Sequence, residues 1–254
     1  MELWFSELHT PNVKFSIKVD RQLYAGRSEF QRIDIFDSKE FGRFLTLDGY
    51  MMLTEKDEFI YHEMITHVPL CVNPDARDEL VVEVCRKYLP QTAGCLSDKR
   101  VAIHYEDGLK FVRHAKDAYD LIIVDSTDPF GPGEGLFTKE FYGNCYKALR
   151  ADGIMVNQHE SPFYTQDAYA MQRTHKRIVS SFPISRVYQA HIPTYPSGHW
   201  LFGFAAKKRH PVKDVDFAHW NALGLKTRYY NTQLHAGAFA LPNYVEEMLR
   251  DVEP

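Results

Sequence analysis

The pattern of hydrophobic and polar positions changes once along this chain, after about residue 54. Before that point, residues 15–19 alternate apolar and polar side chains, and residues 30–36 read as a strand with polar interruptions. Asp48 and Gly49 stand between two apolar runs, and both tolerate the positive φ angles of a tight hairpin turn. Residues 1–54 are therefore predicted to form a small antiparallel β domain.

Beyond residue 54 the apolar positions take up helical spacing. Residues 55–72 carry an apolar stripe that begins at Phe59, and Thr54 is a candidate N-cap for this helix. Residues 78–89 carry a second apolar stripe and predict a second helix.

Strand-like and helical segments then alternate. This order predicts a parallel sheet clad by helices, because a helix is the usual connection between parallel strands. The predicted strands are 101–105, 121–124 and a segment from 154, the predicted helices are 109–115 and 138–149, and 187–192 and 200–205 are predicted closing strands.

Composition limits the classes of function. A chain of 254 residues that is 44% hydrophobic can bury the core of one large domain, alone or with a small addition. The formal charge of -4 gives no basic footprint for nucleic acid or for an anionic membrane. No apolar run reaches transmembrane length, and the first residues lack the features of a signal peptide. We therefore expect neither a nucleic-acid partner nor a membrane partner.

The cysteine and histidine residues give no metal-site pattern. The 4 cysteines are scattered without a CxxC pair, and the 12 histidines show no HExxH arrangement. The sequence therefore predicts no metal site, and its thiols are expected to be reduced, as in a cytosolic protein.

The most informative segment is 119–132. A continuous apolar run, residues 121–124, has the length of a buried parallel strand, and Asp125 and Asp128 follow at its carboxyl end. Open α/β sheets bind their ligands at this edge, and two acids without a neighbouring base suit a positively charged substrate. A polar turn after a strand explains the same residues, so their chemistry alone leaves both interpretations open.

Three segments in the same order resemble the polyamine aminopropyltransferases. They are residues 55–64, 125–134 and 192–198, and the closing segments 229–231 and 235–242 are also similar to bacterial members. The resemblance extends from the first ten residues to about Leu249.

The resemblance implies a fold, an assembly and a reaction. The implied α/β fold is a Rossmann-like, methyltransferase-type doubly wound sheet over residues 55–254, with the small antiparallel β domain at 1–54. Members are usually homodimers or larger homo-oligomers in the cytoplasm. The implied reaction moves an aminopropyl group from decarboxylated S-adenosylmethionine, a co-substrate, to putrescine, giving spermidine and methylthioadenosine. No permanently bound cofactor is implied.

The resemblance also implies the diamine site. Aliphatic amines titrate near pH ~10.4, so a diamine is mostly protonated at neutral pH and must lose a proton before it attacks. By resemblance Asp125 is the base, and Tyr61, Asp128 and Tyr195 belong with it to the diamine pocket. We therefore expect these four side chains to line one pocket.

The nucleoside site is implied in the same way. A carboxylate at Asp107 can accept a hydrogen bond from the adenine amino group, although without the resemblance an Asp-Gly turn is the preferred interpretation of this dipeptide. The acids Asp57, Glu58 and Glu63 either add charge to the channel or lie on a solvated helix face. By resemblance the nucleoside residues are Gln31, His62, Asp107, Gly108 and Pro132.

One departure from the family is serious. Between Arg77 and Asp78 the first βαβ unit, usually about thirty residues, is missing, together with its glycine-rich loop and two acids. Either the chain lacks this unit and is catalytically dead, or the molecule contains residues that the sequence omits. We favour the second, because deleting a central strand would expose a core buried on both faces of the sheet, and it predicts a chain break between these residues.

The sequence therefore leaves three functions open. The leading one is aminopropyl transfer, and the acceptor amine (putrescine, cadaverine, agmatine or spermidine) is not readable from the sequence. The second is S-adenosylmethionine-dependent methyl transfer on the same fold, and the third is a non-catalytic dimeric homologue.

Overall fold

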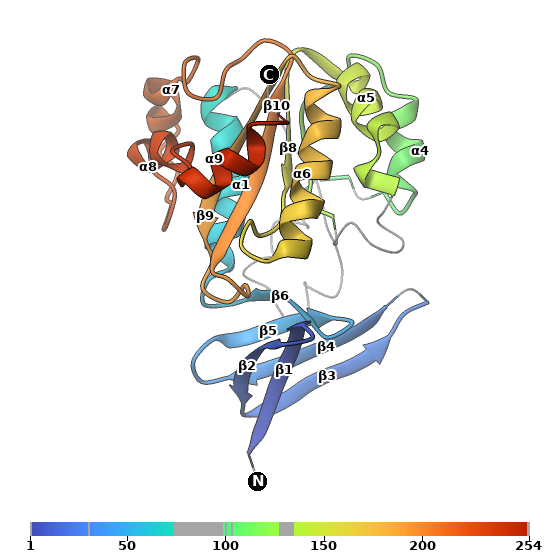
Figure 1. Ribbon diagram of the computed structural model, residues 1–254, viewed down its shortest axis with the longest axis vertical. Helices are drawn as coiled ribbons and strands as arrows, with labels where there is room; N and C mark the ends of the chain where they lie inside the picture. Colours follow the sequence, from blue (N-terminus) through green and yellow to red (C-terminus); the bar gives the residue numbers. More distant parts are fainter. Residues whose placement is uncertain are drawn as a thin grey trace. The chain divides into compact units, whose positions relative to one another are not determined.

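The computed structural model describes residues 2–29, 31–73, 99, 101–102, 104–126 and 135–252. These residues divide into two compact units, shown together in Figure 1. The N-terminal unit contains the chain up to Phe59 and the loop Ile192–Gly198. The C-terminal unit contains the chain from Ile60 onward, apart from that loop and residues 79–103. The limits 1–54 and 55–254 given above stay predictions.

The N-terminal unit is built from two antiparallel sheets, which confirms the predicted β class. Its hairpin turn also forms as predicted, since Asp48 has φ 50° and Gly49 has φ 88°. The first and third strands were not predicted from the pattern. One sheet pairs β1 (Leu3–Thr10) with β2 (Val13–Val19), and the other has the order β3 (Arg21–Arg27), β4 (Arg32–Ser38), β5 (Gly42–Leu47) and β6 (Tyr50–Thr54).

Aromatic side chains form the core of this unit. The rings of Phe5, Phe36 and Phe44 lie 5.1 to 5.6 Å apart, centroid to centroid. Ring pairs at this separation add to the free energy gained by burying apolar area, so they hold the first strand against the larger sheet.

The C-terminal unit contains a mixed four-stranded sheet, part of which is visible beside α6 in Figure 1. The first two strands are parallel and the other two are antiparallel to their neighbours. Together with its helices, the sheet confirms the predicted α/β class. Its strand order is β7 (Tyr119–Val124), β8 (Leu149–Gln158), β10 (His199–Ala206) and β9 (Ile184–His191).

Helices α1 and α6 cover opposite faces of this sheet (Figure 1). On the α6 face Phe141, Leu149, Met155 and Ile178 pack together in a buried core. The pattern did not predict α6 or the last three helices. The described helices are α1 (Glu58–Val72), α4 (Gly108–Arg113), α5 (Lys139–Ala148), α6 (Thr165–Val179), α7 (Phe217–Ala222), α8 (Thr232–Ala238) and α9 (Asn243–Leu249).

Two local predictions are wrong. Residues 101, 102, 104 and 105 form no strand, because within the described residues they have no strand partner, and a strand needs a hydrogen-bonded neighbour. Thr54 is not the N-cap of α1, because the helix begins at Glu58 and the Thr54 hydroxyl instead donates to Asp57 Oδ1 at 2.7 Å. The predicted helix 78–89 and the predicted break between Arg77 and Asp78 lie outside the described residues.

Candidate functional site

Strand register places a row of side chains on the face of the sheet that α1 covers. Tyr188 on β9 pairs with Phe202 on β10, and Phe202 pairs with Gln158 at the end of β8. Directly opposed residues share a face of a sheet, so these three side chains point the same way. The rings of Tyr188 and Phe202 stack with centroids 5.1 Å apart.

The parallel strand β7 brings Asp125 to the end of this row. Val124, the last residue of β7, pairs with Asn157, and Asp125 therefore follows beside Gln158. Tyr61 of α1 lies over the row, with its ring 5.1 Å from that of Phe202. Sheet register and one helix thus gather residues that are far apart in sequence.

Tyr61 and Asp125 are in direct contact. The Tyr61 hydroxyl donates to Asp125 Oδ1 at 2.6 Å, and Tyr61 is 7% exposed while Asp125 is exposed. No other side chain of the described residues is hydrogen-bonded to this carboxylate. Because a carboxylate has about four acceptor positions, Asp125 keeps acceptor capacity for a ligand.

Sequence reasoning missed the polar residues at the end of β8. Gln158 Nε2 donates to Glu160 Oε1 at 2.9 Å and to the carbonyl oxygen of Ser126, the residue after Asp125, at 3.4 Å. Glu160 is 8% exposed and has φ 72°, an unusual conformation for a residue other than glycine. Residues 157–161 are a polar run directly after the apolar residues 154–156 of β8, the same signal that singled out Asp125, so they could have been found in the same way.

The remaining diamine residues are not gathered with this pair within the C-terminal unit. Tyr195 belongs to the N-terminal unit, where its hydroxyl donates to the carbonyl oxygen of Met52 at 2.9 Å. Asp128 lies outside the described residues. The predicted pocket of four side chains is therefore represented by one contact, between Tyr61 and Asp125.

Asp57 is neither a channel acid nor part of a solvated helix face. It is 5% exposed, and it accepts hydrogen bonds from the Thr54 hydroxyl at 2.7 Å and from the Thr194 backbone N–H at 3.0 Å and hydroxyl at 2.6 Å. All of these residues belong to the N-terminal unit. Asp57 therefore anchors the loop that contains Tyr195 to the residues that precede α1.

Glu63 also has a structural role. Its carboxylate accepts hydrogen bonds from the backbone N–H groups of Arg228, Tyr229 and Tyr230 at 2.7 to 2.8 Å. Three donors occupy most of the acceptor capacity of one carboxylate. Glu63 thus holds the segment before α8, and neither of the two interpretations from sequence is correct for it.

The nucleoside residues are spread over both units. Gln31 lies in the N-terminal unit, in a turn with Ser28 directly before β4 rather than inside a strand. His62 lies on α1 beside Tyr61, with the two rings perpendicular and 5.9 Å apart. Pro132 lies outside the described residues.

Asp107 and Gly108 begin a helix instead of forming an isolated turn. Asp107 is the N-cap of α4, and its Oδ1 accepts from the backbone N–H groups of Leu109 at 2.9 Å and Lys110 at 3.4 Å. Both residues are exposed, and Oδ2 takes no part in the cap. An exposed carboxylate beside a helix N-terminus can accept a hydrogen bond from a ligand amino group.

Burial keeps two polar groups of this unit neutral, the Tyr188 hydroxyl in the row and the Cys145 thiol on α5. It raises the pKa of Tyr188 well above its usual value, and the Tyr188 hydroxyl donates to the carbonyl oxygen of Met64 on α1 at 3.1 Å. Burial also raises the pKa of Cys145 to about 12, so this thiol is not a nucleophile at neutral pH. Among the titratable groups that the structure describes at these strand ends, Asp125 is exposed, whereas His159 and Glu160 are buried.

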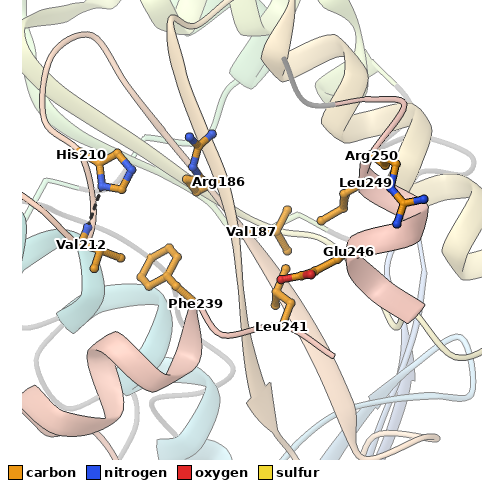
Figure 2. A pocket seen from close by; sticks show the side chains of 9 residues that line it. All are labelled: Arg186, Val187, His210, Val212, Phe239, Leu241, Glu246, Leu249 and Arg250. Atoms are coloured by element: carbon orange, nitrogen blue, oxygen red, sulfur yellow. Dashed lines mark hydrogen bonds between the residues drawn. The ribbon is translucent and has the colours of Figure 1, made fainter. Parts of the chain in front are cut away.

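A pocket of about 660 Å³ lies on the outer side of β9, and Figure 2 shows it from close by. None of the residues predicted for the diamine or the nucleoside lines it. Phe239, one of its lining residues, contacts the row through its ring, whose centroid lies 5.2 Å from that of Tyr188. Its lining residues are Arg186, Val187, His210, Val212, Phe239, Leu241, Glu246, Leu249 and Arg250.

No group of three or more metal-ligand side chains is found within the described residues. In the same part of the chain, no helix has the length and apolar character needed to cross a membrane.

Two family models match this chain. Residues 76–217 match the spermine/spermidine synthase domain, and residues 3–55 match the spermidine synthase tetramerisation domain. The chain therefore belongs to the spermine/spermidine synthase family. The resemblance to the polyamine aminopropyltransferases and the prediction of a transferase enzyme are both confirmed.

Individual relatives agree with this assignment. The chain is 62% identical to polyamine aminopropyltransferases from Alkaliphilus oremlandii and from Clostridium perfringens, with 100% of each chain covered. A spermidine synthase crystallised with the transition-state analogue AdoDATO matches with a TM-score of 0.93 and 40% identity, over 98% of this chain and 95% of the other. Spermidine synthase from Thermotoga maritima matches with a TM-score of 0.91 and 39% identity, over 98% and 94%.

These alignments also show a difference in length. Those with the first two relatives run over 283 positions, against 254 residues in this chain, so at least 29 positions have no counterpart here. A βαβ unit has a comparable length. That the gap falls between Arg77 and Asp78 stays a prediction.

Proposed function

We propose that this protein transfers an aminopropyl group from decarboxylated S-adenosylmethionine to putrescine, producing spermidine and methylthioadenosine. The observation that carries the proposal is the Tyr61–Asp125 hydrogen bond at the carboxyl end of β7. It gives a member of an aminopropyltransferase family an oriented, exposed carboxylate at the edge of the sheet where α/β folds bind ligands.

Asp125 is the proposed general base. The lone pair of the attacking amine forms a bond to the carbon beside the sulfonium, the carbon–sulfur bond breaks, and its electron pair leaves with methylthioadenosine. The amine proton passes to Asp125. Tyr61 occupies one carboxylate oxygen, which fixes the direction of the other toward the substrate.

The rest of the diamine pocket follows from the family resemblance. Asp128 supplies a second negative charge, which favours binding of the protonated end of the diamine electrostatically. Tyr195 supplies an apolar wall, since its hydroxyl is already bonded to Met52.

For the nucleoside, we propose Gln31, His62, Asp107, Gly108 and Pro132. Asp107 is the best supported of these residues, because the cap of α4 uses only one of its oxygens. The second oxygen is available to the adenine amino group. Decarboxylated S-adenosylmethionine acts as a co-substrate, and no permanently bound cofactor is proposed.

We further propose that the protein is a homo-oligomer of the cytoplasm. The match of residues 3–55 to a tetramerisation domain supports assembly, as a dimer or a larger oligomer. Buried free thiols at Cys71 and Cys145 suit a reducing compartment. Light scattering after gel filtration measures the number of subunits directly.

A second candidate function is that of a non-catalytic homologue. The observation that favours it is the shortfall of at least 29 aligned positions, which is long enough to remove one βαβ unit and its loop. Such a protein would keep the fold and the assembly but lose affinity for the nucleoside.

A product assay with decarboxylated S-adenosylmethionine against putrescine, cadaverine, agmatine and spermidine tests the proposal. We expect methylthioadenosine and spermidine to form with putrescine as the preferred acceptor. Calorimetry with methylthioadenosine then distinguishes a wrong assignment of the reaction from a protein that does not bind the nucleoside. Binding without turnover of any amine contradicts the proposed reaction, whereas the absence of both binding and turnover supports the non-catalytic homologue.

A further inference from the structure

A buried line of polar side chains lies on the face of the sheet opposite Tyr61. Asn157 Nδ2 lies 2.9 Å from His159 Nδ1, and His159 Nε2 lies 3.0 Å from His175 Nδ1 on α6. The three residues are 0 to 1% exposed. A connected polar group this deep in an apolar core is costly unless every step is hydrogen-bonded, so its geometry is tightly specified.

The neighbouring strand leaves room for this line. A Cβ atom at Gly203 of β10 would lie 2.5 Å from Asn157 Oδ1 and 2.5 Å from His159 Cε1. Real Cβ atoms do not approach other atoms so closely, and glycine is therefore required at this point for the line to pass.

The direction of the hydrogen bonds follows from Asn157. Its Nδ2 also lies 2.8 Å from the carbonyl oxygen of Gln158, and an amide nitrogen can only donate. His159 Nδ1 is therefore an acceptor, His159 Nε2 carries the proton, and that proton is donated to His175 Nδ1. Both hydrogen bonds of His159 require its neutral form.

The line ends in the middle of the polar run at the end of β8. His159 stands between Gln158 and Glu160, whose side chains point to the other face, and Gln158 donates both to Glu160 and to the carbonyl oxygen of Ser126. The backbone of His159 is also fixed, because its N–H donates to the carbonyl oxygen of Leu201 at 2.9 Å. Holding His159 therefore holds Gln158, and through Ser126 the residue before it, Asp125.

We propose that the Asn157–His159–His175 line is a positioning element for the Asp125 carboxylate, acting through Gln158 and Ser126. The proposal rests on the proposed function, since it takes Asp125 as the base. None of the three residues touches substrate in this scheme. Their effect is on the alignment of Asp125 with Tyr61 and the attacking amine, where small displacements change rates strongly.

The test uses His175→Leu, which removes the acceptor, and His175→Asn, which keeps an oxygen near the position of Nδ1. Met171→Ala, one turn earlier on the same buried face of α6, is the matched control for lost packing. We expect His175→Leu to lower kcat by roughly 10-fold to 10²-fold, with little change in nucleoside affinity, and His175→Asn to recover most of the rate. Met171→Ala should lose stability and keep kcat.

A second variant disrupts the line from β10, where Gly203 lies against Asn157 and His159. Gly203→Ala should displace Asn157 and His159 and lower kcat in the same way, even if His175→Leu does not fold. A crystal structure of either variant should show the Tyr61–Asp125 distance lengthened. This readout does not depend on turnover, so it tests the positioning role even if the wild-type protein transfers no aminopropyl group.

Two results would overturn the proposal. One is a kcat for His175→Leu equal to that of Met171→Ala, because the line would then contribute packing only. The other is an unchanged Tyr61–Asp125 distance in a variant in which the line is broken.

Discussion

Asp57 and Asp125 show how differently two carboxylates of the same chain are used. Asp57, in the N-terminal unit, is 5% exposed and accepts three hydrogen bonds from Thr54 and Thr194. Asp125, in the C-terminal unit, is exposed and accepts one side-chain hydrogen bond from the part of the chain that the structure describes, donated by Tyr61. Acceptor capacity that protein donors have filled stabilises the fold, whereas capacity left open at a strand end can bind a substrate.

Glu63 extends the comparison. It lies two residues after Tyr61 on α1, yet its carboxylate is occupied by three backbone N–H groups, those of residues 228–230. Closeness in sequence to a candidate site residue is therefore a poor guide to function for an acid. Variants of Asp57 and Asp125 test the contrast between occupied and open carboxylates.

The largest expected effect is on turnover in Asp125→Asn. The variant should keep the fold and most of the nucleoside affinity, and kcat should fall by ~10²–10⁴-fold, the usual range for loss of a general base. Rapid-mixing kinetics with putrescine measures the chemical step. Asp120→Asn, on the same strand and in a surface ion pair with Arg150, is the control and should keep its rate.

An unchanged chemical step in Asp125→Asn would remove Asp125 from the role of base. The open carboxylate would then serve only to attract the cationic substrate, and the diamine KM would change in place of kcat.

The next effect is on stability, in Asp57→Ala. The Thr194 backbone N–H would lose its partner in a buried position, which costs about 1–3 kcal/mol in the free energy of unfolding. Urea titration measures this loss. Asp37→Ala, which removes an exposed ion pair with Arg21 in the same unit, should cost less than about 1 kcal/mol. Equal losses in the two variants would contradict a special structural role for Asp57.

Much of the fold was predictable from local patterns. The turn at Asp48 and Gly49 and the buried run of β7 are short-range signals, and both elements form as predicted. The strand predicted at 101–105 does not form in its described residues, because a strand depends on a neighbour that local pattern does not specify. The helix α6 went unrecognised because two polar residues, Thr174 and His175, interrupt its apolar face.

The candidate site was predictable only in part. The position of Asp125 at a strand end is visible in sequence, but its contact with Tyr61 depends on how α1 lies over the sheet. The roles of Asp57 and Glu63 depend on backbone donors more than 130 residues away, which no local pattern indicates. Gln158 and Glu160 carried the same signal as Asp125 and were overlooked.

A third, smaller effect is the dependence of stability on pH. Burial, and then the neighbouring His175, lowers the pKa of His159 well below its usual 6.5 in the folded protein. The unfolded chain therefore binds this proton more readily, and the contribution of His159 to stability is complete above about pH 6.5 and is lost as the pH falls below it. The free energy of unfolding between pH 7.5 and 5.5 should fall less in His159→Gln than in the wild type. A fall of equal size in both proteins would contradict the assignment.

The smallest effect is expected for Tyr195→Phe, which separates the ring of this tyrosine from its hydroxyl. The hydroxyl donates a hydrogen bond to the carbonyl oxygen of Met52. Its loss should lower the free energy of unfolding by about 0.5–1.5 kcal/mol, as for an ordinary hydrogen bond. Because we assign the ring alone to the diamine, the putrescine KM should change little in Tyr195→Phe and rise clearly in Tyr195→Ala. Tyr50→Phe, an exposed tyrosine of the same unit, controls for a lost hydroxyl. If Tyr195→Phe raised the putrescine KM as much as Tyr195→Ala does, the Tyr195 hydroxyl would have to leave the carbonyl oxygen of Met52 and bind the amine. Tyr195 would then resemble the open carboxylate of Asp125 more than the occupied one of Asp57.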